Sequence, residues 1–235
     1  MKIMTFNTQH CLNFIEQKID YQIMADAIKD LNPDIVGLNE MRDKGPDVEY
    51  ENQTSILAEL TGIKHHYFAK AFDVGGENPY GNALLSKYPI ISAETIPVPE
   101  LKIKEGTKYH EPRCLLKAKL EGDITILVIH FGLNSDEHKN AVDTVLKNLE
   151  TQKCILMGDF NVTPENDVLN PIRNQMKDVA GCFDNPLLSF PSNKPELKID
   201  YIFVSPDIEI VSADIPAIIA SDHRPHTATL KIPGV

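Results

Sequence analysis

Several short apolar runs of this sequence are bordered by residues that can bind a metal ion or carry a proton. Four early runs are followed by such residues: Ile3–Phe6 by Asn7, Ile35–Leu38 by Asn39 and Glu40, Ile124–Ile129 by His130, and Cys154–Gly158 by Asp159 and Asn161. In two late runs the order is reversed: Asp200 opens Ile199–Val204, and Asp222 and His223 precede Thr227–Ile232. Ligands commonly bind at the carboxyl ends of strands in α/β sheets. If the late strands run antiparallel to the early ones, all these side chains meet on one rim.

The side chains on this rim suit a hard divalent cation and phosphoester chemistry. They comprise carboxylates, carboxamides and imidazoles, without a thiol: Glu40, Asp159, Asp200, Asp222, Asn7, Asn161, His130 and His223. Such oxygen donors favour Mg²⁺ or Mn²⁺ over a softer metal. Without a cation, four neighbouring carboxylates would repel one another and raise one another's pKa. A metal ion together with carboxamides and imidazoles around one pocket is suited to phosphoester hydrolysis.

The elements that must position these residues are strands alternating with a few helices. Helical periodicity is present in Glu16–Leu31, Glu51–Leu60 and Asp136–Leu149, and Ser135 is the expected N-cap of the last. A further strand-length run, Ala83–Ser86, joins those named above. Nearly continuous apolar strands must be covered on both faces. The pattern therefore predicts a layered α/β or α+β fold.

Length and composition indicate an ordinary globular protein. The chain has 235 residues, of which 42% are hydrophobic and 24% charged, which excludes disorder and fibrous repeats. No composition shift marks a boundary, so we expect a single domain over residues 1–235. The N-terminus becomes polar too early for a signal peptide, and no run reaches the roughly 20 apolar residues of a membrane span. We therefore expect a cytoplasmic protein without a stable membrane anchor, and the scattered cysteines argue against a zinc site.

The charge distribution bears on the substrate. The formal net charge of −11 opposes binding of extended nucleic acid, which needs a basic surface. The stretch Glu100–Leu120 is instead positively charged, with six basic and three acidic side chains. A local basic groove therefore stays open as an alternative. No feature of the sequence indicates a protein partner.

Seven short motifs resemble those of the endonuclease/exonuclease/phosphatase superfamily of metal-dependent phosphoesterases. They occur in the order of that family and extend from residue 3 to residue 225. The motifs are Thr5-Phe6-Asn7, Leu38-Asn39-Glu40, Gly81 to Ile90, Val128 to Phe131, Gly158-Asp159-Phe160-Asn161, Ile199 to Phe203, and Ser221 to Pro225.

The resemblance implies a fold and a set of roles. The fold is an α+β four-layer sandwich, with two mixed β-sheets packed face to face and helices outside. Metal binding by Mg²⁺ or Mn²⁺ is implied for Glu40, with Asn7 and Asp222 close by.

Catalytic roles follow from the same matches. Asp159 would orient or deprotonate the attacking water, and Asn161 would hold that water or a phosphate oxygen. His223, oriented by Asp200, would carry a proton or stabilise the transition state. The resemblance leaves open how the role of general base is divided between Asp159 and the Asp200–His223 pair.

Other positions separate the branches of this family. A histidine at the position of His130 is typical of the DNase, sphingomyelinase and phosphatase-like branches. The abasic-site endonucleases have another residue at that position and also a Trp, which this chain lacks. Related enzymes also place basic and Tyr side chains near Arg113 and Tyr109, which makes these two candidates for contacting a phosphate. One departure is Asn39, where the family usually has Gln.

The leading hypothesis is a divalent-metal-dependent hydrolase of phosphoesters, a phosphodiesterase or phosphatase acting on a small or lipid-derived substrate by in-line attack of an activated water. A metal-dependent nuclease acting on DNA or RNA is the alternative within the same enzyme class. An inactive binding module that kept only the sandwich is a third hypothesis, which the complete set of polar residues disfavours.

Overall fold

Two six-stranded mixed β-sheets form the centre of the structure, a computed structural model that describes residues 1–182 and 187–234. The first sheet has the order β13 (Glu209–Asp214), β14 (His226–Lys231), β1 (Lys2–Asn7), β4 (Ile35–Arg42), β6 (Asn78–Ser86), β5 (His65–Val74). The second has the order β11 (Lys177–Asp178), β12 (Asp200–Val204), β10 (Cys154–Asp159), β9 (Ile124–His130), β8 (Cys114–Leu120), β7 (Ile90–Pro97). A small ribbon pairs β2 (Leu12–Asn13) with β3 (Lys18–Ile19).

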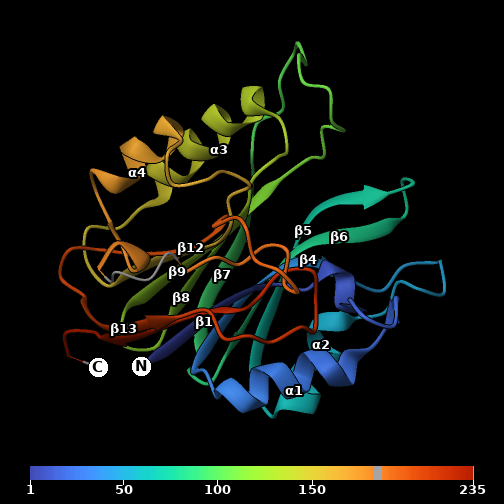
Figure 1. The fold of residues 1–235 in the computed structure, drawn as a ribbon, viewed down its shortest axis with the longest axis horizontal. Helices are drawn as coiled ribbons and strands as arrows, with labels where there is room; N and C mark the ends of the chain where they lie inside the picture. The colour runs from blue at the N-terminus through green and yellow to red at the C-terminus, as the bar shows by residue number, and fades with distance from the viewer. Residues whose placement is uncertain (183–186, 235) are drawn as a thin grey trace.

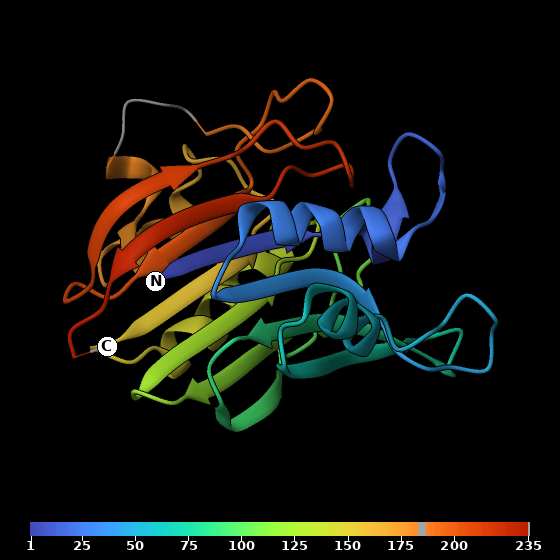
Figure 2. The same cartoon turned by 90° about the horizontal axis from the view of Figure 1, so that it is seen from below.

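Helices cover the outer faces of both sheets. Figures 1 and 2 show α1 (Tyr21–Leu31) and α2 (Gln53–Thr61) outside the first sheet, while α3 (Ser135–Asn148) and α4 (Asn170–Arg173) lie outside the second. Short 3₁₀ turns lie at Gln9–Cys11, Asp167–Leu169 and Ala180–Cys182. This confirms the predicted α+β four-layer sandwich. None of the helices in the described ranges is long and apolar enough to cross a membrane.

The alternation of side chains along the strands builds three apolar layers. On β1, Ile3 points between the sheets and the next residue, Met4, packs against the helices outside. On β10, Ile155 points between the sheets and Leu156 packs toward α3. Because successive strand residues face opposite sides, a strand that is apolar throughout must be sandwiched in this way.

All three predicted helices begin at other residues than expected, and the helix expected over Glu51–Leu60 is α2, which begins at Gln53. The expected helix Glu16–Leu31 begins only at Tyr21, because the Asp20 side chain caps it by accepting from the backbone N–H groups of Gln22 and Ile23. The third helix is capped by Asn134, and the predicted cap Ser135 is its first helical residue. Glu137 completes this start by accepting a hydrogen bond from the Asn134 backbone N–H at 3.2 Å.

Strand directions bring the polar residues to one edge, as predicted. β14 is antiparallel to β1, and β12 is antiparallel to β10 with Asp159 directly opposite Asp200. β9 and β10 are parallel, with His130 opposite Asp159. The carboxyl ends of the early strands therefore meet the amino ends of the late ones.

The stretch Glu100–Leu120 divides into two parts of different structure. Residues up to 113 form a long exposed loop between β7 and β8, which lies at the top of Figure 1. From Cys114 onward the chain enters β8, whose residues Leu115 and Leu116 are fully buried. The sequence pattern did not separate these parts and did not predict β8. It also did not predict β5, β7 and β13 or the two-residue strands β2, β3 and β11.

A buried histidine on β14 makes the fold sensitive to acid. Burial lowers the pKa of His226 to about 4, below the 6.5 of an exposed histidine. Between pH 6.5 and 4 the unfolded chain binds a proton at this position that the folded chain does not, so stability is lost as the pH falls. The expected loss from this group is on the order of 3 kcal/mol.

Denaturant unfolding at pH 7 and pH 4.5 measures this loss. The His226→Gln variant is expected to show a smaller difference between the two pH values than wild type, whereas the exposed His66→Gln control keeps the wild-type difference. An unchanged difference in His226→Gln would contradict the prediction.

Candidate active site

The first sheet supplies Asn7 and Glu40 to the rim. Asn7 ends β1, and Glu40 lies within β4 at a β-bulge, where the register to β6 shifts between Leu38 and Met41. Glu40 has a positive φ of 59°, so the bulge redirects its side chain. The Asn7 Nδ2 donates to Glu40 Oε1 at 3.0 Å and to Asp159 Oδ2 at 3.1 Å, which joins the two sheets at this point.

Asp159 ends β10, and the residue before it must lack a side chain because β9 approaches closely there. Gly158 has φ 146°, and a Cβ on it would lie 1.8 Å from the carbonyl oxygen of Ile129. The Asn39 Oδ1 accepts from the Asp159 backbone N–H at 2.9 Å, and its Nδ2 donates to the Asn82 Oδ1 at 2.8 Å. Although Asn39 departs from the family pattern, its side chain ties the sheets together directly behind the site.

His130 ends β9 between Arg113 and Asp159. Arg113 Nη1 lies 3.0 Å from His130 Nδ1, and His130 Nε2 lies 3.5 Å from Asp159 Oδ2. A guanidinium can only donate, so Nδ1 must accept and the ring proton belongs on Nε2, facing the carboxylate. Burial, with the positive charge of Arg113, holds the pKa of His130 well below its usual range. Neutral His130 is therefore a hydrogen-bond donor to this centre.

Asn161 completes this side of the centre. Its φ of 50° is uncommon for a residue with a side chain, and Asn tolerates it better than most residues. The Asn161 Nδ2 donates to the Phe131 carbonyl at 3.1 Å. It also lies 3.1 Å from His130 Nε2, and because both atoms carry protons this contact is not a hydrogen bond.

His223 forms a buried pair with Asp200. Nδ1 of His223 lies 2.8 Å from Asp200 Oδ2, and its Nε2 lies 3.7 Å from Asp159 Oδ2. Burial lowers the pKa of His223, but the carboxylates of Asp200 and Asp159 outweigh burial and raise it to about 10. His223 is thus a proton-bearing cation at neutral pH, held by one carboxylate and facing another.

Burial disfavours the ionised carboxylates of this centre. It raises the pKa of Asp159 to about 7, with the Asp200 charge acting in the same direction and His223 opposing both. Burial also raises the pKa of Glu40, and the charge of Asp222 adds to this rise. Bringing acidic groups together in this way favours a nearby cation.

The structure brings together most of the predicted site residues but adds one and separates another. Tyr80 on β6 was not predicted; burial and the neighbouring Glu40 raise its pKa well above 10. Its place directly before the matched motif Gly81 to Ile90 was the available signal. Tyr109 lies away from the cluster on the 98–113 loop, 73% exposed, and forms no hydrogen bond to another described residue.

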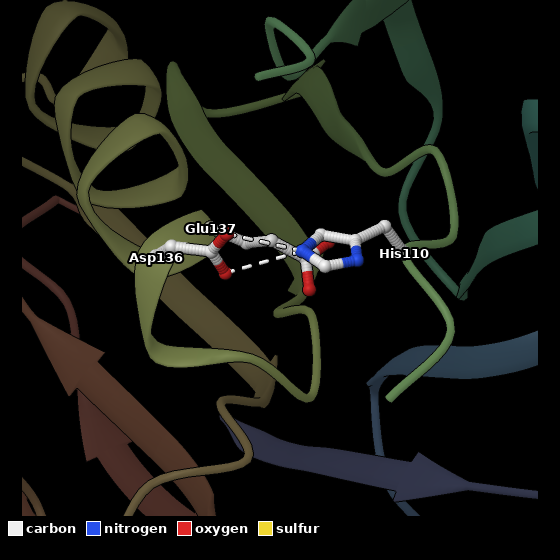
Figure 3. A group of neighbouring side chains, drawn as sticks. All are labelled: His110, Asp136 and Glu137. Atoms are coloured by element: carbon white, nitrogen blue, oxygen red, sulfur yellow. Dashed lines mark hydrogen bonds and ion pairs between the residues drawn. The ribbon is translucent and has the colours of Figure 1, made fainter. Parts of the chain in front are cut away.

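Two clusters in the described part of the chain have donor atoms within 4.8 Å of one another. One is Asp159, Asp200 and His223 at the centre. The other is His110, Asp136 and Glu137, in which His110 from the 98–113 loop faces the first turn of α3 (Figure 3). There His110 Nε2 lies 3.1 Å from Asp136 Oδ2, while Glu137 caps the helix. This second cluster fastens the loop to α3.

A four-layer sandwich with carboxylates, carboxamides and imidazoles at one end of both sheets defines the class of protein that the motifs predicted. The sequence profile of the Endonuclease/Exonuclease/phosphatase family matches residues 4–223, and the chain belongs to this family. Members are generally hydrolases of phosphoesters and typically use divalent metal ions.

Comparisons with individual proteins agree with this assignment. The chain is 24% identical to the uncharacterized protein YbhP of Escherichia coli, across 98% of this chain and 96% of YbhP. It resembles the crystal structure of an endonuclease/exonuclease/phosphatase from Beutenbergia cavernae (TM-score 0.80, 21% identity, covering 100% of this chain and 72% of that one). It also resembles the mannosyl-6-phosphatase Bt3783 of Bacteroides thetaiotaomicron (TM-score 0.78, 16% identity, covering 99% and 100%).

Proposed function

We propose that this protein is a Mg²⁺- or Mn²⁺-dependent hydrolase of phosphoesters that cleaves a small or lipid-derived substrate with an activated water. One observation carries this proposal: the Asp159 Oδ2 is surrounded by Asn7 at 3.1 Å, His130 at 3.5 Å and His223 at 3.7 Å. These groups come from both sheets and from distant parts of the chain. Such convergence suits a reaction that needs acceleration at the upper end of the enzymatic range.

The residues near Glu40 fit a divalent cation. The charge of Asp222 adds to the rise in the pKa of Glu40, both carboxylates offer hard oxygen donors, and the Asn7 carboxamide lies beside Glu40. A cation held by Glu40, with Asn7 and Asp222 close by, would offset this repulsion. When bound, it would act as a Lewis acid on the phosphoryl oxygens.

The protein side chains divide the remaining work. Asp159 would orient the attacking water and accept its proton, while Asn161 and the Nε2–H of His130 would position that water or a phosphate oxygen. His223, protonated and aimed by Asp200, would donate to the phosphoryl or leaving-group oxygen. Arg113 would hold His130 in its donor tautomer and add positive charge.

The charge of the chain supports a small phosphoester over extended nucleic acid. The net charge of −11 provides no general attraction for a polyanion. A fold neighbour that is a mannosyl-6-phosphatase supports including sugar phosphates among the substrates tested. A nuclease would lose affinity steeply with added salt, whereas a small-substrate enzyme would not.

A substrate panel tests the proposal. Purified protein would be assayed with Mg²⁺, Mn²⁺ or EDTA on p-nitrophenyl phosphate, bis-p-nitrophenyl phosphate, sugar phosphates, lysophosphatidic acid and short DNA. We expect hydrolysis of at least one phosphoester with metal and none with EDTA. Metal-independent activity, or none on the whole panel, would contradict the proposal.

Removing the Glu40 charge should weaken metal binding. The Glu40→Gln variant is expected to bind Mn²⁺ at least about 100-fold more weakly than wild type, because a neutral amide replaces the main anionic ligand. Isothermal titration measures this affinity, with the exposed Glu59→Gln on α2 as a control of equal charge change. Equal affinities in all three proteins would exclude Glu40 as a ligand.

A further inference from the structure

A groove of about 610 Å³ opens beside the candidate active site. It is lined by three segments: residues 105–108 of the long β7–β8 loop, residues 133–135 at the start of α3, and residues 161–163 after β10. His138 on α3 and Asn166 complete the lining. None of these side chains except that of Asn161 has a role in the proposed chemistry.

The loop wall of this groove is fixed in place by hydrogen bonds to the start of α3. The Glu105 backbone N–H donates to Asp136 Oδ2 at 2.8 Å, and the Lys108 backbone N–H donates to Asn134 Oδ1 at 2.9 Å. The Asn134 Nδ2 donates back to the Lys108 carbonyl at 3.2 Å. His110 adds its contact to Asp136 (Figure 3). The wall is therefore preorganised, which lowers the entropy cost of binding a ligand against it.

The groove is continuous with the reacting centre through Asn161. This residue lines the groove, and its Nδ2 lies 3.1 Å from His130 Nε2. His130 in turn lies 3.5 Å from the Asp159 carboxylate. A phosphoester with its phosphorus at the centre can therefore extend the rest of the molecule into the groove.

Three polar side chains of the lining are free to bind a ligand. Within residues 1–182 and 187–234, the side chains of Thr107, Lys108 and Ser135 form no hydrogen bond or ion pair, and all three are exposed. Leu133 is the apolar side chain of the lining that a ligand can reach, because it is 53% exposed whereas Val162 is only 4% exposed. Such a lining, with hydroxyls and an ammonium around one apolar side chain, matches a compact molecule that has both hydroxyl groups and C–H faces.

The charges of the groove lining bear on which class of phosphoester fits it. The two charged side chains of the lining, Glu105 and Lys108, are of opposite sign, and Asp136 and Glu137 lie directly behind the wall. The groove therefore provides no net attraction for a second phosphate. A single exposed leucine is also too little apolar surface to bind an acyl chain.

We infer that this groove binds the alcohol part of the substrate and that this part is a polyol, as in a sugar phosphate. The inference rests on the proposed function and narrows its substrate class. Lys108 and Thr107 would bind hydroxyl groups of the polyol, with Leu133 against its C–H face.

Steady-state kinetics of the metal-loaded protein tests the inference. The quantity measured is the ratio of kcat/KM on glucose 6-phosphate, mannose 6-phosphate or sn-glycerol 3-phosphate to kcat/KM on p-nitrophenyl phosphate, whose leaving group has no sugar hydroxyls. Lys108→Met and Thr107→Val are each expected to lower this ratio about tenfold on the preferred polyol phosphate, because a binding site loses discrimination when it loses a hydrogen bond to a substrate hydroxyl. Lys102→Met, in the same loop but outside the groove, is the matched control and should keep the wild-type ratio.

The outcomes separate this inference from the proposed function. Wild-type activity on p-nitrophenyl phosphate with no preference for any polyol phosphate, or an unchanged ratio in both groove variants, would overturn the inference alone. The same holds if lysophosphatidic acid or fructose 1,6-bisphosphate is the preferred substrate. Inactivity on every phosphoester would contradict the proposed function. Calorimetric binding of glucose 6-phosphate to wild type and Lys108→Met would then test the groove directly. Equal affinities of the two proteins, or no binding to the wild type, would overturn the inference about the groove.

Discussion

The Asp159→Asn variant is expected to lower kcat by about 10³–10⁴-fold on any phosphoester that the wild type hydrolyses, because it removes both the proton acceptor and the charge on which the site converges. The amide keeps the size of the side chain and an oxygen to accept from the Asn161 backbone N–H, which donates to Asp159 Oδ1 at 2.9 Å. Folding should therefore be preserved.

Initial rates at saturating substrate, with far-UV circular dichroism and thermal unfolding on the same samples, measure this effect. Asp123→Asn is the matched control, because it makes the same chemical change at an exposed position. Asp123 lies just before the first residue of β9, whereas His130 is the last residue of that strand. A folded Asp159→Asn protein with kcat within tenfold of wild type would show that another group activates the water.

The second large effect is expected at the Asp200–His223 pair. His223→Gln should lower kcat by about 10²–10³-fold, because the transition state loses a charged donor. Asp200 acts through His223, at 2.8 Å from its Nδ1, and is a positioning residue, so Asp200→Asn should lower kcat by a similar factor. The double variant should be little worse than either single variant, because groups that act as a unit are strongly non-additive. Independent, multiplying effects would contradict this coupling.

The pH dependence of kcat/KM tests whether Asp200 positions His223 or has only a structural role. Asp200 is the first of the two carboxylates that hold the pKa of His223 near 10. Its replacement by Asn lowers that pKa, so the protonated donor is lost at a lower pH. The alkaline limb of kcat/KM should therefore move to lower pH in Asp200→Asn than in wild type. A folded variant with an unmoved limb would argue against His223 as the proton-bearing group.

The class of fold and most residues of the candidate site could be predicted from the sequence. Polar residues that interrupt apolar runs, such as Asn7, His130 and Asp159, could be assigned to strand ends because a buried strand tolerates them only there. The family motifs supplied their order. Helix ends were less certain, since Asp20 and Asn134 cap their helices through backbone contacts that neighbouring polar residues could equally have made.

The contacts that join these side chains could not be predicted and are seen in the folded protein. Glu40 faces the site because of a bulge in β4, Tyr80 approaches it from the next strand, and Asn39 binds across both sheets. The groove beside Asn161 exists because a loop and a helix start, distant in sequence, are fastened by Asn134 and Asp136. These features depend on contacts between residues far apart along the chain, which the local spacing of a sequence does not encode.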